Sequence, residues 1–257
     1  NDLHVTIDGS PALTPFGFGG WVAMTRGDHD MDVMMGDLVL TQDQVNPVMS
    51  ALLIQGLEVT ALHNHFFWEE PRVFFMHVHG HGKPMELARA VKPALDLMLG
   101  PPASLAGATA ASPSPTRTKL DTAALDRVAG STGERAGPVY KYTPGRDDLH
   151  VTEMGATINA RMGLNTWAAF IGTDDSAMVA GDVAMVESEV TPVLRALRSH
   201  GLDVVAIHHH MTGTQPMIIF LHYWGKGPAA KLAEGFRAAL NELGPQGRAS
   251  TGRSTLR

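Results

Sequence analysis

Hydrophobic and polar positions follow two different periods in the first part of the chain, and these periods predict its local structure. Residues 21–24 and 33–40 are rich in β-branched and apolar side chains and predict strands. Between Thr41 and Gly56, apolar residues recur every three or four positions, which is the spacing of one buried helix face. Thr41 is the expected N-cap and Gly56 the expected end. Pro47 predicts a helix that begins later or irregularly.

The next residues predict a hairpin followed by a second helix. Residues 57–65 and 72–80 alternate in the manner of strands, and residues 66–71 connect them. Because this connection is only six residues long, an antiparallel pairing is favoured. Apolar residues at helical spacing follow over 84–98 and stop before a Gly-Pro pair. The unit predicted by these patterns is ββαββα.

The same unit occurs twice. When the sequence is shifted by 145 positions, residues 36–98 align without a gap with residues 181–243, and 22 of 63 positions are identical. The Gly36-Asp37 pair falls on Gly181-Asp182 in this alignment. An internal duplication of this length predicts an α+β fold of two similar halves, with antiparallel hairpins backed by helices and a pseudo-twofold relation between them.

Composition divides the chain into four segments. The two repeats are predicted at 1–99 and 139–244. The segment 100–138 begins with a stretch rich in Pro, Ala, Ser and Gly and is predicted to be a linker, with a short helix at 120–128. The last segment, 245–257, is small, polar and basic, and is predicted to be a disordered tail.

Overall composition excludes several classes of function. The chain has 257 residues, 44% of them hydrophobic, and a formal net charge of -6. An acidic chain without clustered positive charge is a poor nucleic-acid binder. No apolar run approaches the ~20 residues that a membrane-spanning helix needs. Since the chain contains no Cys, disulfides, thiolate metal ligands and Cys nucleophiles are excluded.

Histidine is the residue type that suggests a function. The chain has 13 His, and His63 and His65 share one face of a predicted strand because side chains alternate. His77 has the same parity on the partner strand, and His79 extends this row. Their imidazoles are therefore expected to lie together at the rim of the core. Imidazole is the commonest protein ligand for zinc and copper, so these four residues are candidate metal ligands.

Charged residues follow the first strand of this hairpin. Glu69 lies four residues after His65, with Glu70 beside it, and either carboxylate is a candidate fourth ligand or catalytic base. Arg72 is a candidate for binding an anionic group of a substrate, or for a simple ion pair with these acids. His81 is a further candidate substrate contact.

The second copy keeps the three histidines and loses their surroundings. The retained residues are His208, His210 and His222. The second copy replaces Glu69, Arg72, His79 and His81 by Thr214, Met217, Trp224 and Lys226. This comparison predicts a more capable metal site in the first copy and a reduced or structural site in the second.

Three functional hypotheses remain open. The first is a divalent-metal protein, with zinc as the expected ion, that activates water in a hydrolase or lyase reaction. The second is a non-catalytic carrier of copper or zinc, for which the 14 Met residues would suit copper. The third is a metal-free module whose histidines bind a small molecule or an anion. In a fourth, purely structural interpretation, each histidine is a hydrogen-bonded strand residue without a ligand.

Several motifs resemble one bacterial family. They are Gly36-Asp37-Leu38-Val39-Leu40, Val45-Asn46-Pro47-Val48, the segment Val59 to His65, Glu69-x-Pro71-Arg72 and Phe75-Met76-His77. This set resembles the LppY/LpqO family, whose function is unknown. Because members of that family are often exported or lipid-anchored, the resemblance implies an extracytoplasmic location. The resemblance names no activity. The family pattern also carries Glu and Arg near Thr214 and Met217, so this chain departs from it in the second copy.

Overall fold

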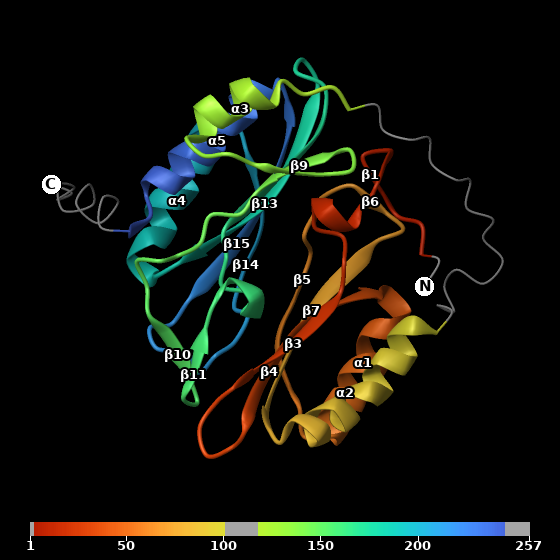
Figure 1. The fold of residues 1–257 in the computed structure, drawn as a ribbon. Coiled ribbons are helices and arrows are strands. Elements are labelled where there is room, and N and C mark those ends of the chain that lie inside the picture. The colour runs from red at the N-terminus through yellow and green to blue at the C-terminus, as the bar shows by residue number, and fades with distance from the viewer. Residues whose placement is uncertain (1–2, 101–117, 245–257) are drawn as a thin grey trace, which may run out of the picture.

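Two antiparallel sheets face each other at the middle of the molecule, and helices cover the outer side of each sheet (Figure 1). The computed structural model describes residues 3–100 and 118–244. In these residues the chain has an α+β fold with five α-helices. None of the described helices is both long and apolar enough to cross a membrane. The predicted tail at 245–257 and the first part of the predicted linker lie outside the described residues.

The first sheet has four strands in the order β3-β4-β7-β5. Two helices, α1 and α2, pack on its outer face through a continuous apolar core. The strands and helices of this half are β3 (Trp21–Arg26), β4 (Asp32–Thr41), α1 (Gln42–Ile54), β5 (Glu58–His63), β7 (Val73–Gly82) and α2 (Pro84–Leu99). Each lies where the hydrophobic pattern predicts it, within a few residues at the ends.

The start of α1 differs from the prediction. The helix begins at Gln42 and includes Pro47, so the expectation of a later start was wrong. The N–H of Thr41 donates to Oε1 of Gln44 at 3.0 Å, as a capping box requires. Val48 and Leu52 on the same helix are fully buried. Capping and burial together outweigh the one hydrogen bond that proline removes.

The second sheet has six strands in the order β14-β15-β13-β12-β9-β8. Its first four strands correspond to β5, β7, β4 and β3, in that order, so they repeat the order of the first sheet read from its other edge. The elements of this half are α3 (Thr122–Ala129), β8 (Glu134–Ala136), β9 (Val139–Tyr142), β12 (Trp167–Gly172), β13 (Ala177–Met185), α4 (Glu187–Ser199), β14 (Asp203–His208), β15 (Ile219–Gly227) and α5 (Ala229–Asn241). The described part of the predicted linker belongs to this half, because α3 joins its core and β8 joins its sheet.

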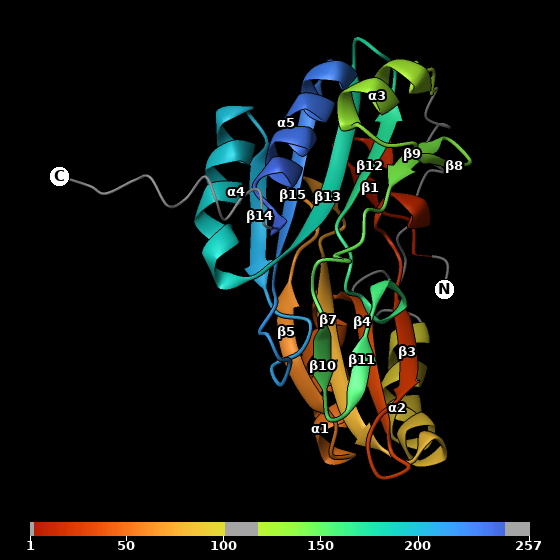
Figure 2. The ribbon, with the colours of Figure 1, turned by 60° about the vertical axis from the view of Figure 1, so that its left-hand side comes forward.

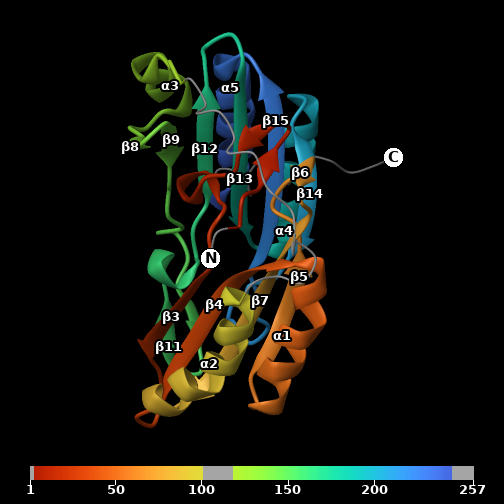
Figure 3. The same ribbon diagram turned by 90° about the vertical axis from the view of Figure 1, so that its right-hand side faces the viewer.

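Each half sends a short arm onto the sheet of the other half. The first arm contains β1 (Thr6–Ile7), β2 (Ser10–Pro11) and the 3-10 helix η1 (Thr14–Phe16), and β1 also pairs with β6 (Glu69–Glu70). It packs against the inner face of the second sheet, in front of β13 in Figure 3. The second arm contains β10 (Val151–Glu153), β11 (Ala156–Ile158) and η3 (Ala160–Met162). It packs against the first sheet, as Figure 2 shows. This exchange holds the halves together and leaves a polar region between two apolar clusters.

Candidate metal centre

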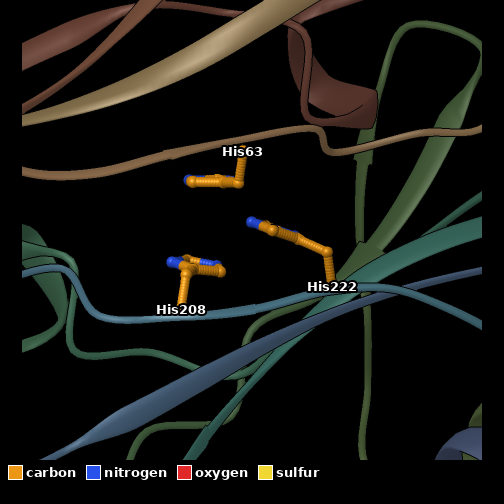
Figure 4. Close-up of side chains that lie close together, drawn as sticks. All are labelled: His63, His208 and His222. Carbon is orange, nitrogen blue, oxygen red and sulfur yellow. The ribbon is translucent and has the colours of Figure 1, made fainter.

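Six histidines from the two halves meet in that polar region. All are buried, with exposed fractions between 1% and 8%. Figure 4 shows the rings of His63 and His208 facing each other from the two halves, with His222 beside them. The six residues are His63, His65, His77, His208, His210 and His222. The structure thus brings both predicted triads together in one cluster. The more capable site expected in the first copy, and the reduced site in the second, stay predictions.

Strand alternation and a matched irregularity place these side chains. In the first half, the pairing of β5 with β7 shifts between Val59 and Ala61, so that Ala61 lies opposite His77. His63 is two residues beyond Ala61 and therefore shares its face. In the second half, the pairing of β14 with β15 shifts at the equivalent place and sets Ala206 opposite His222. Both sheets consequently present their histidines from the same end of the hairpin.

The rings lie in pairs across the boundary between the halves, the central pair stacked and the other two tilted. The central pair is His63 with His208, whose ring centroids are 3.8 Å apart. On either side, His77 lies 4.2 Å from His210 and His65 lies 4.0 Å from His222, again between centroids. Each pair joins one residue of each half, so neither half holds the cluster alone.

Hydrogen bonds to backbone carbonyls orient several of these rings. Nδ1 of His77 lies 3.2 Å from the carbonyl oxygen of Gly36, and Nδ1 of His222 lies 3.2 Å from that of Gly181. Nδ1 of His65 lies 2.9 Å from the carbonyl oxygen of Gly17. A neutral ring of His77 or His222 donates from Nδ1 in this geometry and keeps its lone pair on Nε2.

Three of the remaining ring nitrogens have no hydrogen-bond partner in the part of the chain that the structure describes. Nε2 of His63, His77 and His222 is buried and makes no hydrogen bond within the described residues. The candidate donor atoms form three groups, and within each group the atoms lie within 4.8 Å of one another. They are His63 with His208 and His222, His77 with His208 and His210, and Asp37 with His63 and His77. Buried polar atoms normally have a partner, so these converging lone pairs fit a metal ion.

Burial keeps the cluster in the protonation state that metals bind. Burial, assisted by the neighbouring His65 and His77, lowers the pKa of His63 to about 3. Burial also lowers the pKa of His77, and it holds the pKa of His208 well below the ordinary value. The rings of His63, His77 and His208 are therefore neutral at pH 7 and able to act as ligands.

Two equivalent aspartates stand beside the rings. Oδ2 of Asp37 lies 3.2 Å from Nε2 of His65, and Oδ2 of Asp182 lies 3.6 Å from Nε2 of His210. Burial works to raise the pKa of Asp37, but the nearby His77 and His65 lower it to about 2 overall. Burial raises the pKa of Asp182 to about 8. At pH 7 the pair therefore carries about one negative charge.

A pocket of about 360 Å³ opens onto this cluster. Trp21 and Trp167 line it at equivalent positions of the two halves, and Lys141 and Arg161 also line it. The cluster residues that line it are His65, His77, His210, His222, Asp37 and Asp182. The candidate centre is therefore buried within the protein yet reachable by a small molecule.

The predicted acids lie elsewhere. Glu69 and Glu70 line a second pocket of about 480 Å³, together with Arg72, and none of them lines the pocket at the histidines. Oε1 of Glu69 accepts a hydrogen bond from Asn64 at 3.1 Å. Nε of Arg72 lies 3.6 Å from the same oxygen, while the Arg72 side chain is 60% exposed.

The two other predicted histidines also stand apart from the cluster. His79 lies between two carboxylates, with Nδ1 3.4 Å from Glu58 and Nε2 3.1 Å from Glu153 of the second arm. His81 is exposed. The structure instead adds Asp37 and Asp182 to the candidate centre. The repeated Gly-Asp pair was the sequence signal for these two residues.

Comparison with known proteins places the chain in a family. The family model described as "Domain of Unknown Function (DUF1259)" matches residues 1–97 and 123–242. The chain belongs to this family. The two matched segments correspond to the two halves of the fold, and the family description carries no activity. No curated protein matches the chain.

Three solved structures are similar over most of their length at low identity. One is a trimeric bacterial microcompartment shell protein PduB, at 11% identity, with 88% of this chain and 90% of that chain covered and a TM-score of 0.21. Another is the fused permuted hexameric shell protein MSM0275 from the RMM microcompartment, at 11% identity, 87% and 94% coverage and a TM-score of 0.23. The third is EtuB from Clostridium kluyveri, at 14% identity, 94% and 95% coverage and a TM-score of 0.24. These scores are too low to support any statement about this protein.

Proposed function

We propose that this protein binds a divalent metal ion, with zinc as the expected ion and copper as the alternative, at the histidine cluster shared by its two halves. The supporting observation is the set of buried Nε2 atoms without a partner on His63, His77 and His222. Ligand histidines usually donate their other nitrogen to a carbonyl or carboxylate, and the Nδ1 contacts of His77 and His222 follow this rule.

The pocket favours a centre that acts on a small molecule over a closed carrier site. A catalytic metal keeps a position open to solvent or substrate, whereas a storage site encloses its ion. Here His65, His77, His210 and His222 all line an open pocket. A bound zinc ion would supply Lewis-acid and water-activating chemistry for a hydrolase or lyase reaction.

Within that proposal, Asp37 takes the role of proton acceptor. Its carboxylate lines the pocket, is ionised at pH 7 and lies beside His65. A base must reach the proton that it removes, and geometry takes priority over basicity in choosing it. Glu69 and Glu70, which the sequence suggested for this role, line the other pocket.

Two further proposals concern the relation between the halves and the location of the protein. We interpret the two halves as copies of one ββαββα unit related by a pseudo-twofold, which the shared strand order and the 145-residue alignment support. The resemblance to the LppY/LpqO family and the extracytoplasmic location that it implies are retained as proposals, supported by the motifs alone.

Elemental analysis tests the metal proposal directly. Protein purified without a His tag is incubated with zinc or copper, desalted and analysed beside the variant His63→Ala/His65→Ala/His77→Ala. The matched control replaces three exposed histidines, His4, His150 and His200, by Ala. We expect near-stoichiometric metal in the wild type and in the control, and none in the cluster variant. A wild-type protein that retains no metal after either incubation would refute the proposal.

A further inference from the structure

Lys141 reaches the pocket from a strand that lies beside the repeated part of the second sheet. On β9, Tyr140 and Tyr142 face the helices and belong to the outer core. Val139 has the opposite orientation and belongs to the inner apolar cluster. Lys141 shares the parity of Val139, so its side chain enters the region between the two halves and lines the pocket.

The ammonium group of Lys141 makes no ion pair with a carboxylate in the described part of the chain. It lies 4.4 Å from the centroid of the Trp167 ring, and within the described residues it makes no hydrogen bond or ion pair. In contrast, Lys92, Lys226 and Lys231 each contact a carboxylate although they are far more exposed. Burial also lowers the pKa of Lys141, while the charge of Asp182 acts in the other direction. A half-buried ammonium group that contacts a ring but makes no hydrogen bond or ion pair is costly, and an anion would relieve that cost.

A second cation stands in the same pocket. Arg161 lies in η3 of the second arm, and its guanidinium group is exposed without an ion pair among the described residues. Lys141 and Arg161 thus provide two basic groups in a lining whose carboxyl groups are those of Asp37 and Asp182. A bound metal ion would add positive charge, so the pocket attracts negative charge.

We propose that the pocket takes a small organic carboxylate whose anionic oxygens contact Lys141 while the rest of the molecule extends toward the histidine cluster. The inference rests on the proposed function in one respect, since the far end of the ligand would meet the metal centre. A volume of about 360 Å³ is within the range of small-molecule sites. The rings of Trp21 and Trp167 offer flat apolar walls for the body of the ligand. The two carboxyl groups in the lining, Asp37 and Asp182, disfavour a multiply charged anion such as phosphate.

Calorimetric titration with matched probes tests this assignment. The probes are acetate, succinate and benzoate, with benzamide as a neutral analogue of benzoate and inorganic phosphate as the competing anion class. They are titrated into zinc-treated wild type, Lys141→Gln, Lys141→Arg and the control Lys226→Gln. We expect at least one carboxylate to bind the wild type, and Lys141→Gln to weaken it about tenfold, which corresponds to about 1.4 kcal/mol. The carboxylate affinity of Lys141→Arg and Lys226→Gln should stay close to that of the wild type. The affinity for benzamide should not change with any of the three substitutions.

Three results would overturn the inference: no carboxylate binding to the wild type, equal binding to Lys141→Gln, or tighter binding of phosphate than of every carboxylate. The same titrations on chelator-treated protein, combined with elemental analysis, separate this inference from the proposed function. Metal retention with carboxylate affinity independent of Lys141 would reject the inference alone. Lys141-dependent carboxylate binding by a protein that never retains metal would reject the metal function alone.

Discussion

The imidazole rings of His63 and His208 lie face to face, with centroids 3.8 Å apart and planes inclined by 11°, although one ends β5 and the other ends β14. They occupy equivalent positions, 145 residues apart in the chain. The candidate centre is therefore a product of the contact between the two halves. His208 belongs to two of the three groups of converging donor atoms, and His63 also belongs to two.

The first prediction concerns this sharing of ligands. The single substitution His208→Ala should remove bound metal as completely as His63→Ala if the ion sits in the group of His63, His208 and His222, which contains both residues and ligands from both halves. The measurement is metal per chain by elemental analysis after zinc loading and desalting. The exposed His200 provides the matched control, and His200→Ala should retain the wild-type amount.

A different outcome would identify a different arrangement. If His208→Ala and His63→Ala each left about half of the metal, the two copies would hold independent sites. The shared centre would then be rejected even though metal binding itself would stand.

The second prediction concerns stability. A metal ion held by ligands from both halves links them, so it should stabilise the folded protein by mass action. At a free zinc concentration 100 times the dissociation constant, the free energy of unfolding should rise by about 2.7 kcal/mol. The measurement is denaturant unfolding with zinc and with a chelator. The His63→Ala/His65→Ala/His77→Ala variant should give the same curve under both conditions. A zinc effect of equal size in that variant would place the stabilising ion elsewhere.

The third prediction concerns Gly17. Its φ of +100° favours glycine, a Cβ there would lie 2.6 Å from the Trp167 ring, and its carbonyl oxygen lies 2.9 Å from Nδ1 of His65. Gly17→Ala should therefore displace the carbonyl group that orients His65. The affinity for zinc should fall about tenfold or more, as it does when groups that support metal ligands are changed. Competition with a chromogenic chelator measures this affinity.

Gly56 provides the control for Gly17. It also has a positive φ, of +77°, but a Cβ there would meet nothing within 4 Å. Gly56→Ala should bring backbone strain without loss of zinc affinity. Equal weakening by both substitutions would show that Gly17 acts through general destabilisation and not through His65.

Local patterns predicted the arrangement inside each hairpin but not the meeting of the two hairpins. Alternation along a strand is enough to place His63, His65 and His77 on one face. The stacking of His63 on His208 depends on arms that cross to the opposite sheet, and no local period encodes such long-range packing. Glu69 was favoured for its closeness in sequence to His65, yet the connecting loop turns it into another pocket. Lys141 gave no signal because its strand, at the start of the predicted second repeat, has no counterpart in the first sheet.

The last prediction concerns the strand that carries Lys141. Oδ1 of Asp126 on α3 accepts hydrogen bonds from the hydroxyl groups of Tyr140 and Tyr142, each at 2.9 Å, and from the N–H of Gly133 at 3.1 Å. Although burial works to raise the pKa of Asp126, these donors lower it overall. Because the pKa is lower in the folded state, the stabilisation from the carboxylate is complete above its unfolded pKa, near 4, and is lost as the pH falls through the folded pKa.

Asp126→Asn should accordingly lower the free energy of unfolding by about 1 kcal/mol at pH 7, a value reduced for partial exposure to solvent. The difference from the wild type should stay constant between pH 5 and pH 8 and shrink below about pH 4. Denaturant unfolding across this range measures it. Asp96→Asn, which removes an exposed ion pair with Lys92 on α2, is the control and should change little at any pH. If the loss in Asp126→Asn persisted undiminished under acid conditions, the negative charge on Asp126 would not be what holds α3 to β9. The anchoring of the Lys141 strand would then have to be assigned to the apolar contacts of Leu125 and Ala129 in the outer core.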